Sequence, residues 1–284
     1  MAKCLLCIGY GFSARALTAD LQQQGWHVIG TTRNEDRAHI MREAGVQPII
    51  WPSHDLDQAL KDASHLLVSA SPSSEGDPFL NAVDPKAYEF SWIGYLSTTG
   101  VYGDHNGGWV DETSSLNPAT KRGQWRVDAE TAWSNMGLPL HIFRLAGIYG
   151  PGRGPFSKVR NGTARRIIKD GQVFSRIHVD DISQVLQASI NHPRPGAIYN
   201  VCDNEPAPPQ NVIKYAAQIL KLPVPPDIPF EAAELTSMAR SFYAENKRVR
   251  NDLIKSELGV NLKYPNFKVG LQSLLDKKFV KKPS

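Results

Sequence analysis

The sequence lacks a long hydrophobic run, a strong excess of charge and any internal repeat. No stretch approaches the roughly 18 apolar residues that a membrane-spanning helix needs, so we expect no membrane partner. The net charge of +4 is small and scattered, which does not predict a nucleic-acid partner. With 284 residues, 41% of them hydrophobic, the chain is long enough to bury a large core.

Cysteine is scarce. Cys4, Cys7 and Cys202 are an odd number without a disulfide pattern. The Cys4-x-x-Cys7 spacing resembles half of a redox or zinc site, but residues three apart on a strand point to opposite faces. We therefore expect two buried small hydrophobic side chains and no metal site.

The amino-terminal residues superficially imitate a secretory signal, with Lys3, an apolar stretch and a run of small residues at 13–16. A glycine-rich turn interrupts that stretch, and cleavage would destroy it. We therefore expect a cytoplasmic protein.

Strand and helix patterns alternate along the chain. Short apolar runs predict strands at 4–8, 27–30, 46–51, 65–69, 92–96, 140–144 and 197–201, and helical spacing covers 15–21, 36–43, 128–136, 182–190 and 211–220. This alternation predicts an α/β fold, a Rossmann-type doubly wound parallel sheet. We expect a dinucleotide-binding domain at 1–150 and a smaller, mainly substrate-binding lobe at 151–284, with segments that cross back to the Rossmann domain.

Gly9-x-Gly11-x-x-Ala14 directly follows the first predicted strand and opens a helical pattern. Gly9 permits a tight turn, Gly11 lets backbone N–H groups approach a pyrophosphate, and Ala14 lets the helix pack close to the strand. The strand–turn–helix context favours a dinucleotide site over an ordinary glycine-rich turn. The predicted contacts are Gly9, Tyr10, Gly11, Phe12, Ser13 and Ala14.

The end of the second predicted strand bears on the choice of dinucleotide. A site for NAD would usually place an acid here to accept the ribose 2′-hydroxyl, but no acid occurs before Glu35. Arg33 stands there instead, beside Thr32, and a guanidinium suits a 2′-phosphate. We expect NADP(H) in preference to NAD(H), although a solvated arginine at a helix start would look the same.

Five further segments follow in a recognisable order: Leu96-Ser-Thr-Thr-Gly-Val-Tyr-Gly103, Arg144-Leu-Ala-Gly-Ile-Tyr-Gly-Pro-Gly152, Ile177-His-Val-Asp-Asp181, Ile198-Tyr-Asn-Val201 and Asn246-Lys-Arg-Val-Arg250. Together they resemble the motifs of the extended short-chain dehydrogenases/reductases, the superfamily of sugar-nucleotide epimerases and dehydratases, over essentially the whole chain. The cofactor contacts expected beyond the turn are Ser69, Ala70, Ser71, Thr98 and Arg126.

The catalytic pair of that superfamily is replaced. Thr98 holds the hydroxyl position, and Glu130 fits the Glu four residues after the family's Tyr-x-x-x-Lys, which aligns Arg122 with the Tyr and Arg126 with the Lys. Arginine cannot act as a base near neutral pH. The resemblance gives Arg126 the Lys role at the nicotinamide ribose. We expect Arg122 to polarise a carbonyl or hold an anion, unless it is a surface residue of a pocket that has lost catalysis.

Another group must then move the proton. We name Tyr102 and Tyr149 as candidates because they lie near strand ends, where ligands of open α/β sheets bind. Asp104, His105 and Asp128 are further candidates, although each of the five has a structural reading too.

The sequence also differs from the superfamily at other motif positions. Thr98 is followed by Thr99 and Gly100 where a dehydratase has Asp-Glu, Gly147 replaces the Asn that often contacts a sugar nucleotide, and Phe174 replaces an Arg. Sugar-nucleotide epimerase and 4,6-dehydratase activity are therefore not expected. The chain resembles an atypical branch of the superfamily.

Basic residues crowd into the segment after the sixth predicted strand. They are Arg153, Lys158, Arg160, Arg165, Arg166 and Lys169. A solvated cationic surface explains many such clusters, but the segment borders the substrate in the resembled family and suits an anionic substrate. We expect Arg153, inside Gly-Pro-Gly-Arg-Gly-Pro, to contact the substrate.

The sequence thus predicts an NADP(H)-dependent oxidoreductase, monomeric or homodimeric, that acts on the carbonyl or hydroxyl of a small molecule. The alternative is a non-catalytic NADP(H)-binding regulator or redox sensor, since the cofactor motifs are intact and the Tyr/Lys pair is not.

Overall fold

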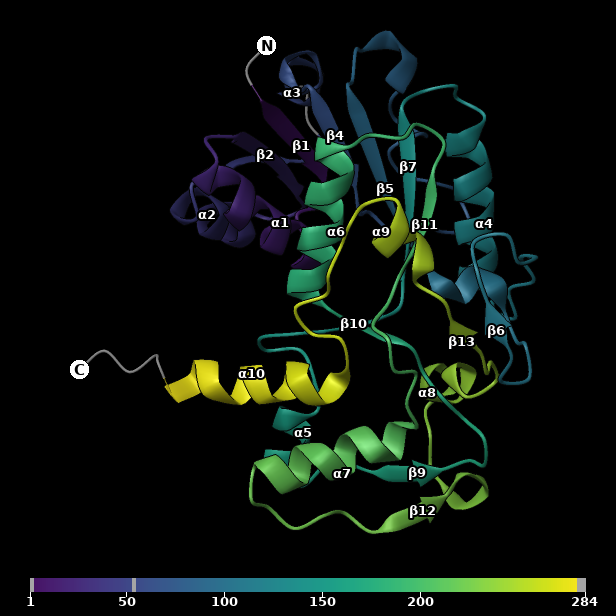
Figure 1. Cartoon of the computed structure of the whole chain (residues 1–284). Helices are drawn as coiled ribbons and strands as arrows, with labels where there is room; N and C mark the ends of the chain where they lie inside the picture. The colour runs from purple at the N-terminus through teal and green to yellow at the C-terminus, as the bar shows by residue number, and fades with distance from the viewer. Residues whose placement is uncertain (1–2, 53–54, 280–284) are drawn as a thin grey trace.

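The computed structural model describes residues 3–52 and 55–279. Seven parallel strands form the central sheet in the order β11-β7-β5-β4-β1-β2-β3 (Figure 1). Their bounds are β1 Cys4–Ile8, β2 His27–Thr32, β3 Gln47–Ile50, β4 His65–Val68, β5 Trp92–Thr98, β7 Leu140–Leu145 and β11 Ile198–Val201. The predicted strands and the Rossmann-type fold are confirmed. Because the strand order reverses between β1 and β4, a ligand crevice is expected outside their carboxyl ends.

Helices cover both faces of the sheet. On one face, α1 (Phe12–Gln23) and α6 (Val179–Asn191) pack together over a core that includes Cys7. On the other, α3 (Asp55–Asp62) and α4 (Lys121–Ser134) cover a core that includes Cys4. Both thiols are free and buried on opposite faces of β1, as predicted. Helix α2 (Glu35–Glu43) lies beside β2 and β3.

Helices α4 and α6 begin earlier than predicted, and a side-chain cap marks each start. Helix α4 begins at Lys121, seven residues before the predicted start, because the Thr120 hydroxyl accepts a hydrogen bond from the Gly123 N–H at 3.1 Å. Helix α6 begins at Val179, and His178 caps it by accepting from the Asp180 N–H at 3.1 Å. The aspartates at 180 and 181 lie in the first turn of α6.

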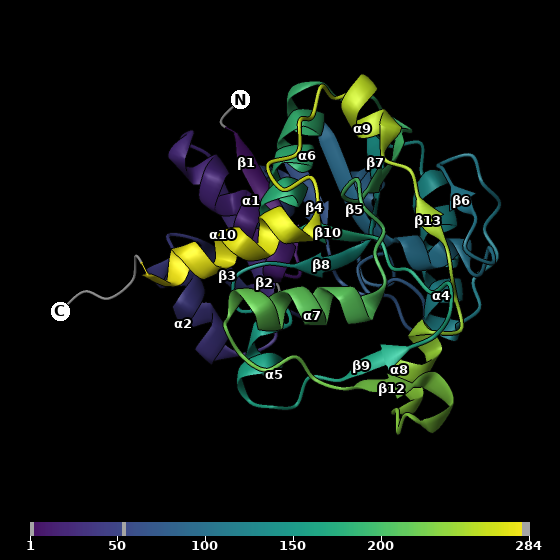
Figure 2. The same cartoon turned by 60° about the horizontal axis from the view of Figure 1, so that its bottom comes forward.

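The smaller lobe gathers below the sheet edge and comes forward in Figure 2. It contains two-stranded pairings of β8 with β10 and of β9 with β12, together with helices α5, α7, α8 and α10. Their bounds are β8 Gly147–Tyr149, β9 Arg166–Ile168, β10 Arg176–His178, β12 Asp227–Pro229, α5 Phe156–Arg160, α7 Pro209–Ile219, α8 Ser237–Phe242 and α10 Phe267–Phe279.

The expected boundary at residue 150 does not divide the chain cleanly. Helix α6, strand β11 and α9 (Asp252–Ser256) follow it in sequence but pack on the Rossmann sheet, as the expected crossings require. Strand β13 (Arg248–Val249) returns further, pairing with β6 (Trp109–Val110) of the first half. The short helices η1 (Pro85–Ala87), η2 (Thr99–Tyr102) and η3 (Phe230–Ala232) complete the elements. Within the described ranges, no helix combines the length and apolar character needed to cross a membrane.

Candidate functional site

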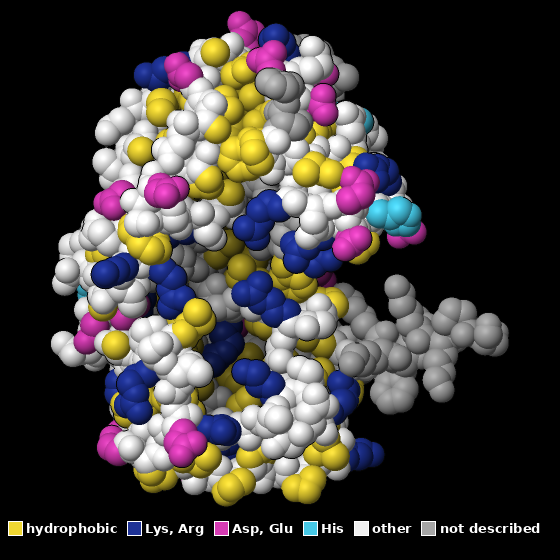
Figure 3. All heavy atoms as spheres, turned by 180° about the vertical axis from the view of Figure 1, so that it is seen from behind, with side chains coloured by type: hydrophobic (Ala, Val, Ile, Leu, Met, Phe, Trp, Pro, Cys, Tyr) yellow, Lys and Arg dark blue, Asp and Glu magenta, His cyan; other side chains and the backbone are white. Residues whose placement is uncertain are grey.

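A cleft of about 970 Å³ opens between the carboxyl edge of the sheet and the smaller lobe. Its walls come from the glycine-rich turn, the segments that follow β4, β5 and β7, helix α4, the 150–155 loop, β10 and α8. Figure 3 shows Lys and Arg side chains gathered around the hollow on this face of the molecule.

The glycine-rich turn has the geometry of an anion site. Gly9 has a φ of +86°, and a Cβ there would lie 3.1 Å from the Ala70 nitrogen. Gly11 begins α1 with no side-chain cap, and a Cβ there would meet nothing within 4 Å. Gly11 lines the cleft, so its backbone faces open space where a phosphate can approach.

The other residues of the turn differ in whether their side chains point into the cleft or into the core. Phe12 and Ser13 line the cleft, whereas Ala14 is buried against the sheet in the core that contains α1. The Tyr10 ring turns inward, and its hydroxyl lies 2.9 Å from the Thr18 hydroxyl. Only the backbone of Tyr10 is therefore near the turn's open side.

The end of β2 lies outside the cleft. Thr32 is buried, and its Oγ1 has no hydrogen-bond partner among the described residues. Arg33 is exposed beyond it. The preference for NADP(H) that Arg33 predicts stays a prediction.

The segment after β4 approaches the turn directly. The Ser69 hydroxyl donates to the Gly9 carbonyl, and the Ala70 N–H donates to the Ile8 carbonyl at 3.1 Å. Ser69 and Ser71 line the cleft, and Ala70 does not.

Arg126 and Thr98 stand together in the cleft wall. The Arg126 guanidinium donates to the Tyr95 hydroxyl at 3.0 Å, to the Leu96 carbonyl at 2.8 Å and to the Ser71 hydroxyl at 3.1 Å. The Thr98 hydroxyl accepts from the Gly100 N–H at 3.1 Å, which leaves its own proton to donate. Arg126 is thus a cation held in place by the ends of β4 and β5.

Arg122 reaches across the cleft to α8. Its Nη2 lies 3.4 Å from the Ser241 hydroxyl, and its guanidinium carbon lies 6.0 Å from the centroid of the Phe242 ring. The side chain is exposed and lines the cleft, so it is less constrained than Arg126.

The two candidate tyrosines occupy different surroundings. Tyr102 is fully buried outside the cleft lining, with its hydroxyl donating to Asn200 at 2.7 Å and accepting from Arg144 at 3.0 Å. Burial raises the pKa of Tyr102 to about 12. Proximity to a strand end placed Tyr102 in the site, but the side chain points into the core, which corrects its expected role as proton donor.

Tyr149 lines the cleft, but its hydroxyl points toward α10, 3.5 Å from the Asn266 carbonyl. A Cβ on Gly270 of that helix would lie 2.0 Å from this hydroxyl oxygen. Burial raises the pKa of Tyr149, so the phenol is protonated at neutral pH.

The three weaker proton-donor candidates hold local structure outside the cleft lining. The Asp104 carboxylate accepts from the Asn246 N–H at 2.7 Å, and His105 lies 3.1 Å from the Tyr102 carbonyl. Asp128 accepts from Gln124 on its own helix at 2.8 Å.

Three of the six cations in the basic segment bind the protein itself, which corrects their expected position beside the substrate. Arg165 donates to the Glu234 carbonyl at 2.8 Å, Arg166 pairs with Asp227 at 2.6 Å, and Lys169 donates to the Tyr243 carbonyl. Of the segment's cations, Arg153 lines the cleft, with its guanidinium carbon 5.6 Å from the centroid of the Phe12 ring.

Sequence reasoning missed three charged residues of the cleft, Arg176, Glu245 and Lys247. Lys247 pairs with Glu245 at 2.6 Å, and the Arg176 guanidinium donates to main-chain oxygens through Nη1. All lie in or beside motifs quoted above, but nothing local showed which side chains turn inward. The described lining contains four arginines and one lysine, against one glutamate. This excess of positive charge favours the binding of anions in the cleft.

A buried ion pair lies outside the cleft lining. Arg144 and Glu130 pair at 2.8 Å, both almost fully buried, and the Ser97 hydroxyl donates to Glu130. These bonds join α4, which carries Arg126, to β7 and to the end of β5, which carries Thr98.

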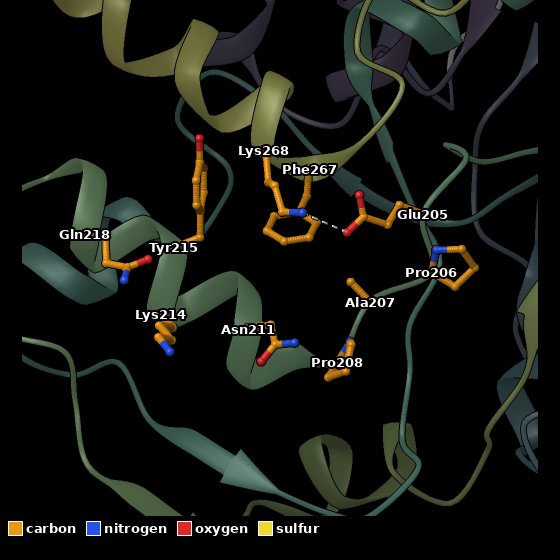
Figure 4. A pocket seen from close by; sticks show the side chains of 10 residues that line it. All are labelled: Glu205, Pro206, Ala207, Pro208, Asn211, Lys214, Tyr215, Gln218, Phe267 and Lys268. Atoms are coloured by element: carbon orange, nitrogen blue, oxygen red, sulfur yellow. Dashed lines mark hydrogen bonds and ion pairs between the residues drawn. The ribbon is translucent and has the colours of Figure 1, made fainter.

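A second hollow of about 300 Å³ lies between α7 and the start of α10 (Figure 4). Lys268 and Glu205 form an ion pair across it at 3.3 Å. This pair occupies two of the charged side chains in its wall, and we assign the candidate site to the larger cleft.

Known proteins similar to this chain share its length. Protein YeeZ of Escherichia coli K12 is 30% identical over 282 residues, which cover 93% of this chain and 97% of YeeZ. A conserved protein of unknown function from Silicibacter pomeroyi is 58% identical, with a TM-score of 0.94, covering 97% of this chain and 99% of that one.

The dTDP-glucose 4,6-dehydratase of Bacillus anthracis, solved with NAD, is 18% identical with a TM-score of 0.77, covering 99% of this chain and 98% of the dehydratase. At that identity the likeness shows the fold, which is that of NAD-dependent epimerases and dehydratases. No family model matches the chain.

Proposed function

The chain belongs to the YeeZ family, and from that premise we propose that it binds a nicotinamide dinucleotide and acts as an oxidoreductase. We propose NADP(H) in preference to NAD(H), and a small anionic molecule with a carbonyl or hydroxyl group as the substrate. The structurally similar dehydratase was solved with NAD, which supports a dinucleotide here.

The observation that carries the proposal is the open cleft at the uncapped start of α1. Gly11 leaves room for a phosphate beside backbone N–H groups, and Gly9 makes the turn that brings the backbone there. These residues fit the cofactor.

A bound nicotinamide would supply or accept the hydride. Arg126 adds a fixed positive charge beside Thr98, whose hydroxyl proton is available to a substrate oxygen. Arg122 is freer and can turn toward a substrate anion or a developing oxyanion. Tyr149 remains the alternative proton donor if its hydroxyl leaves the Asn266 carbonyl.

A second candidate function is a dinucleotide-binding regulator without turnover. The specific observation in its favour is that Arg122 and Arg126 replace the Tyr/Lys pair, while the phenol of Tyr102 is buried outside the cleft lining. In such a protein the cofactor half of the site persists without a conventional base.

Isothermal titration with NADPH and NADH, followed by a turnover screen of small carbonyl acids and sugar phosphates, tests the proposal. If Arg122 stabilises an oxyanion, Arg122→Ala lowers kcat by roughly 10²–10³-fold. If it only anchors the substrate, KM rises and kcat is preserved. Tight NADPH binding without turnover favours the regulator, and a failure to bind either dinucleotide contradicts both functions.

A further inference from the structure

The side chain of Arg153 differs from those of Arg165 and Arg166 in having no hydrogen-bond acceptor among the described residues. Among the described residues, no carboxylate or carbonyl receives a hydrogen bond from its guanidinium, whereas those of Arg165 and Arg166 are engaged by the smaller lobe. An exposed cation that lines a cleft without a protein partner is available to a ligand.

The position of Arg153 is fixed relative to α1. Gly150 and Arg153 exchange main-chain hydrogen bonds of 2.8 and 3.0 Å, which closes a tight turn. A Cβ on Gly150 would lie 3.1 Å from the Phe12 ring, so this turn packs directly on the first residue of α1. The Arg153 guanidinium then lies over the face of the same ring, a favourable cation–π arrangement.

Two positive groups therefore border the same end of the cleft. One is the uncapped start of α1, with no acidic residue in its first turn, and the other is the Arg153 guanidinium. A pyrophosphate carries negative charge over two phosphates, and guanidinium groups bind phosphate oxygens through paired N–H donors. The other cleft cations Arg122 and Arg176 come from different walls, α4 and β10.

We propose that Arg153 binds the dinucleotide pyrophosphate and not the substrate. The Gly150–Arg153 turn then closes the cofactor site from the side opposite the glycine-rich turn, with Phe12 between them. This inference rests on the proposed function and gives Arg153 a different ligand from the substrate that the sequence suggested.

Titration calorimetry with NADPH and NADH on wild type, Arg153→Ala and Arg153→Gln tests it. Both variants should weaken both dinucleotides by about tenfold or more, and by the same factor, since the pyrophosphate is common to the two. Arg160→Ala is the matched control: Arg160 also lies over a phenylalanine ring, 5.4 Å from Phe156, but does not line the cleft. Its affinities should stay within twofold of wild type.

Unchanged dissociation constants in both Arg153 variants, with thermal unfolding like that of wild type, would overturn the proposal. Weakening of NADPH alone would also overturn it, because that result assigns the contact to the 2′-phosphate. If wild type binds neither dinucleotide, the proposed function itself fails. The two failures are therefore distinguishable.

Discussion

Arg126 donates a hydrogen bond of 2.8 Å to the main-chain oxygen of Leu96, which ties helix α4 to strand β5 near its carboxyl end. The same guanidinium holds Ser71 beyond β4. The residue aligned with the family's lysine thus joins three elements of the cleft wall and also faces the cleft.

Arg126→Ala should lower the free energy of unfolding by about 2 kcal/mol, because it removes charge-assisted hydrogen bonds to partly buried acceptors. Urea denaturation measures the change. Arg122→Ala on the same helix loses a 3.4 Å contact with Ser241 and the contact with the Phe242 ring, both at the surface, and should stay within about 0.5 kcal/mol of wild type. Equal losses in the two variants would show that the Leu96 tie carries no stability.

The two glycines of the turn should respond differently to valine. Gly11 has a φ of −95° and open space at its Cβ, so Gly11→Val should fold, at a cost of about 1 kcal/mol at the helix start, and lose NADPH binding. Gly9→Val combines a φ of +86° with a close approach to Ala70 and should lose more stability, about 2 kcal/mol or more. Thermal unfolding with and without NADPH separates the effects. A full ligand-induced shift in Gly11→Val would contradict this account of the turn.

Arg33→Ala should weaken NADPH binding while leaving NADH binding unchanged. The predicted partner of this guanidinium is the 2′-phosphate that NADPH carries and NADH lacks, and loss of one charged contact costs about 1.5–3 kcal/mol. Titration of both dinucleotides checks this. Arg42 lies in the last turn of α2 and pairs with Glu35, the first residue of that helix. Arg42→Ala is the control and should change the affinity for neither dinucleotide. Equal wild-type affinities for NADH and NADPH would remove the basis for the preference.

Asp203 should make stability fall as pH rises. Burial raises the pKa of its carboxyl to about 8, and its Oδ2 has no hydrogen-bond partner among the described residues. In the unfolded chain the same group has a pKa near 3.9. Between about pH 4 and 8 the folded state therefore holds a proton that the unfolded state has lost. Stability from this group is largest below pH 4 and declines by at most about 1.4 kcal/mol per pH unit toward pH 8.

The Asp203→Asn variant tests this sign, because the amide stays neutral and keeps an oxygen for the Glu205 N–H. Its unfolding free energy should lose this part of the pH dependence and exceed that of wild type at pH 8. If instead the wild type and the variant show the same pH dependence between pH 5 and 8, the carboxyl is ionised in the fold.

Local sequence signals predicted the fold well. The turn at Gly9 and Gly11 lies between a strand and a helix that are both adjacent in sequence, so its geometry needs no distant partner. Helix α4 was predicted too short because the residues around Arg122 lack an apolar pattern. Helix α4 starts after Thr120 because its hydroxyl accepts a hydrogen bond from the Gly123 N–H. That bond forms in the folded helix, so a single threonine in the sequence does not identify the cap.

The site was harder to predict because its walls are distant in sequence. Arg122 contacts Ser241, 119 residues later, and no spacing rule connects them. Tyr102 ends the short helix η2 beside the cleft. Its side chain points into the core, where its hydroxyl donates to Asn200 on β11, 98 residues later in the sequence. Arg166 and Arg153 looked alike in one basic segment, and only the pairing with Asp227 separates a structural cation from a cleft cation.

The return of the chain to the first half after residue 150 also bears on how the protein unfolds. Strand β11 completes the central sheet beside β7, and β13 pairs with β6 across an interval of about 140 residues. Such non-local pairing raises contact order and makes folding slow. It also couples the two lobes, so unfolding should be one cooperative event. A protease cut in the 150–155 loop would yield two fragments, neither of which contains the complete central sheet.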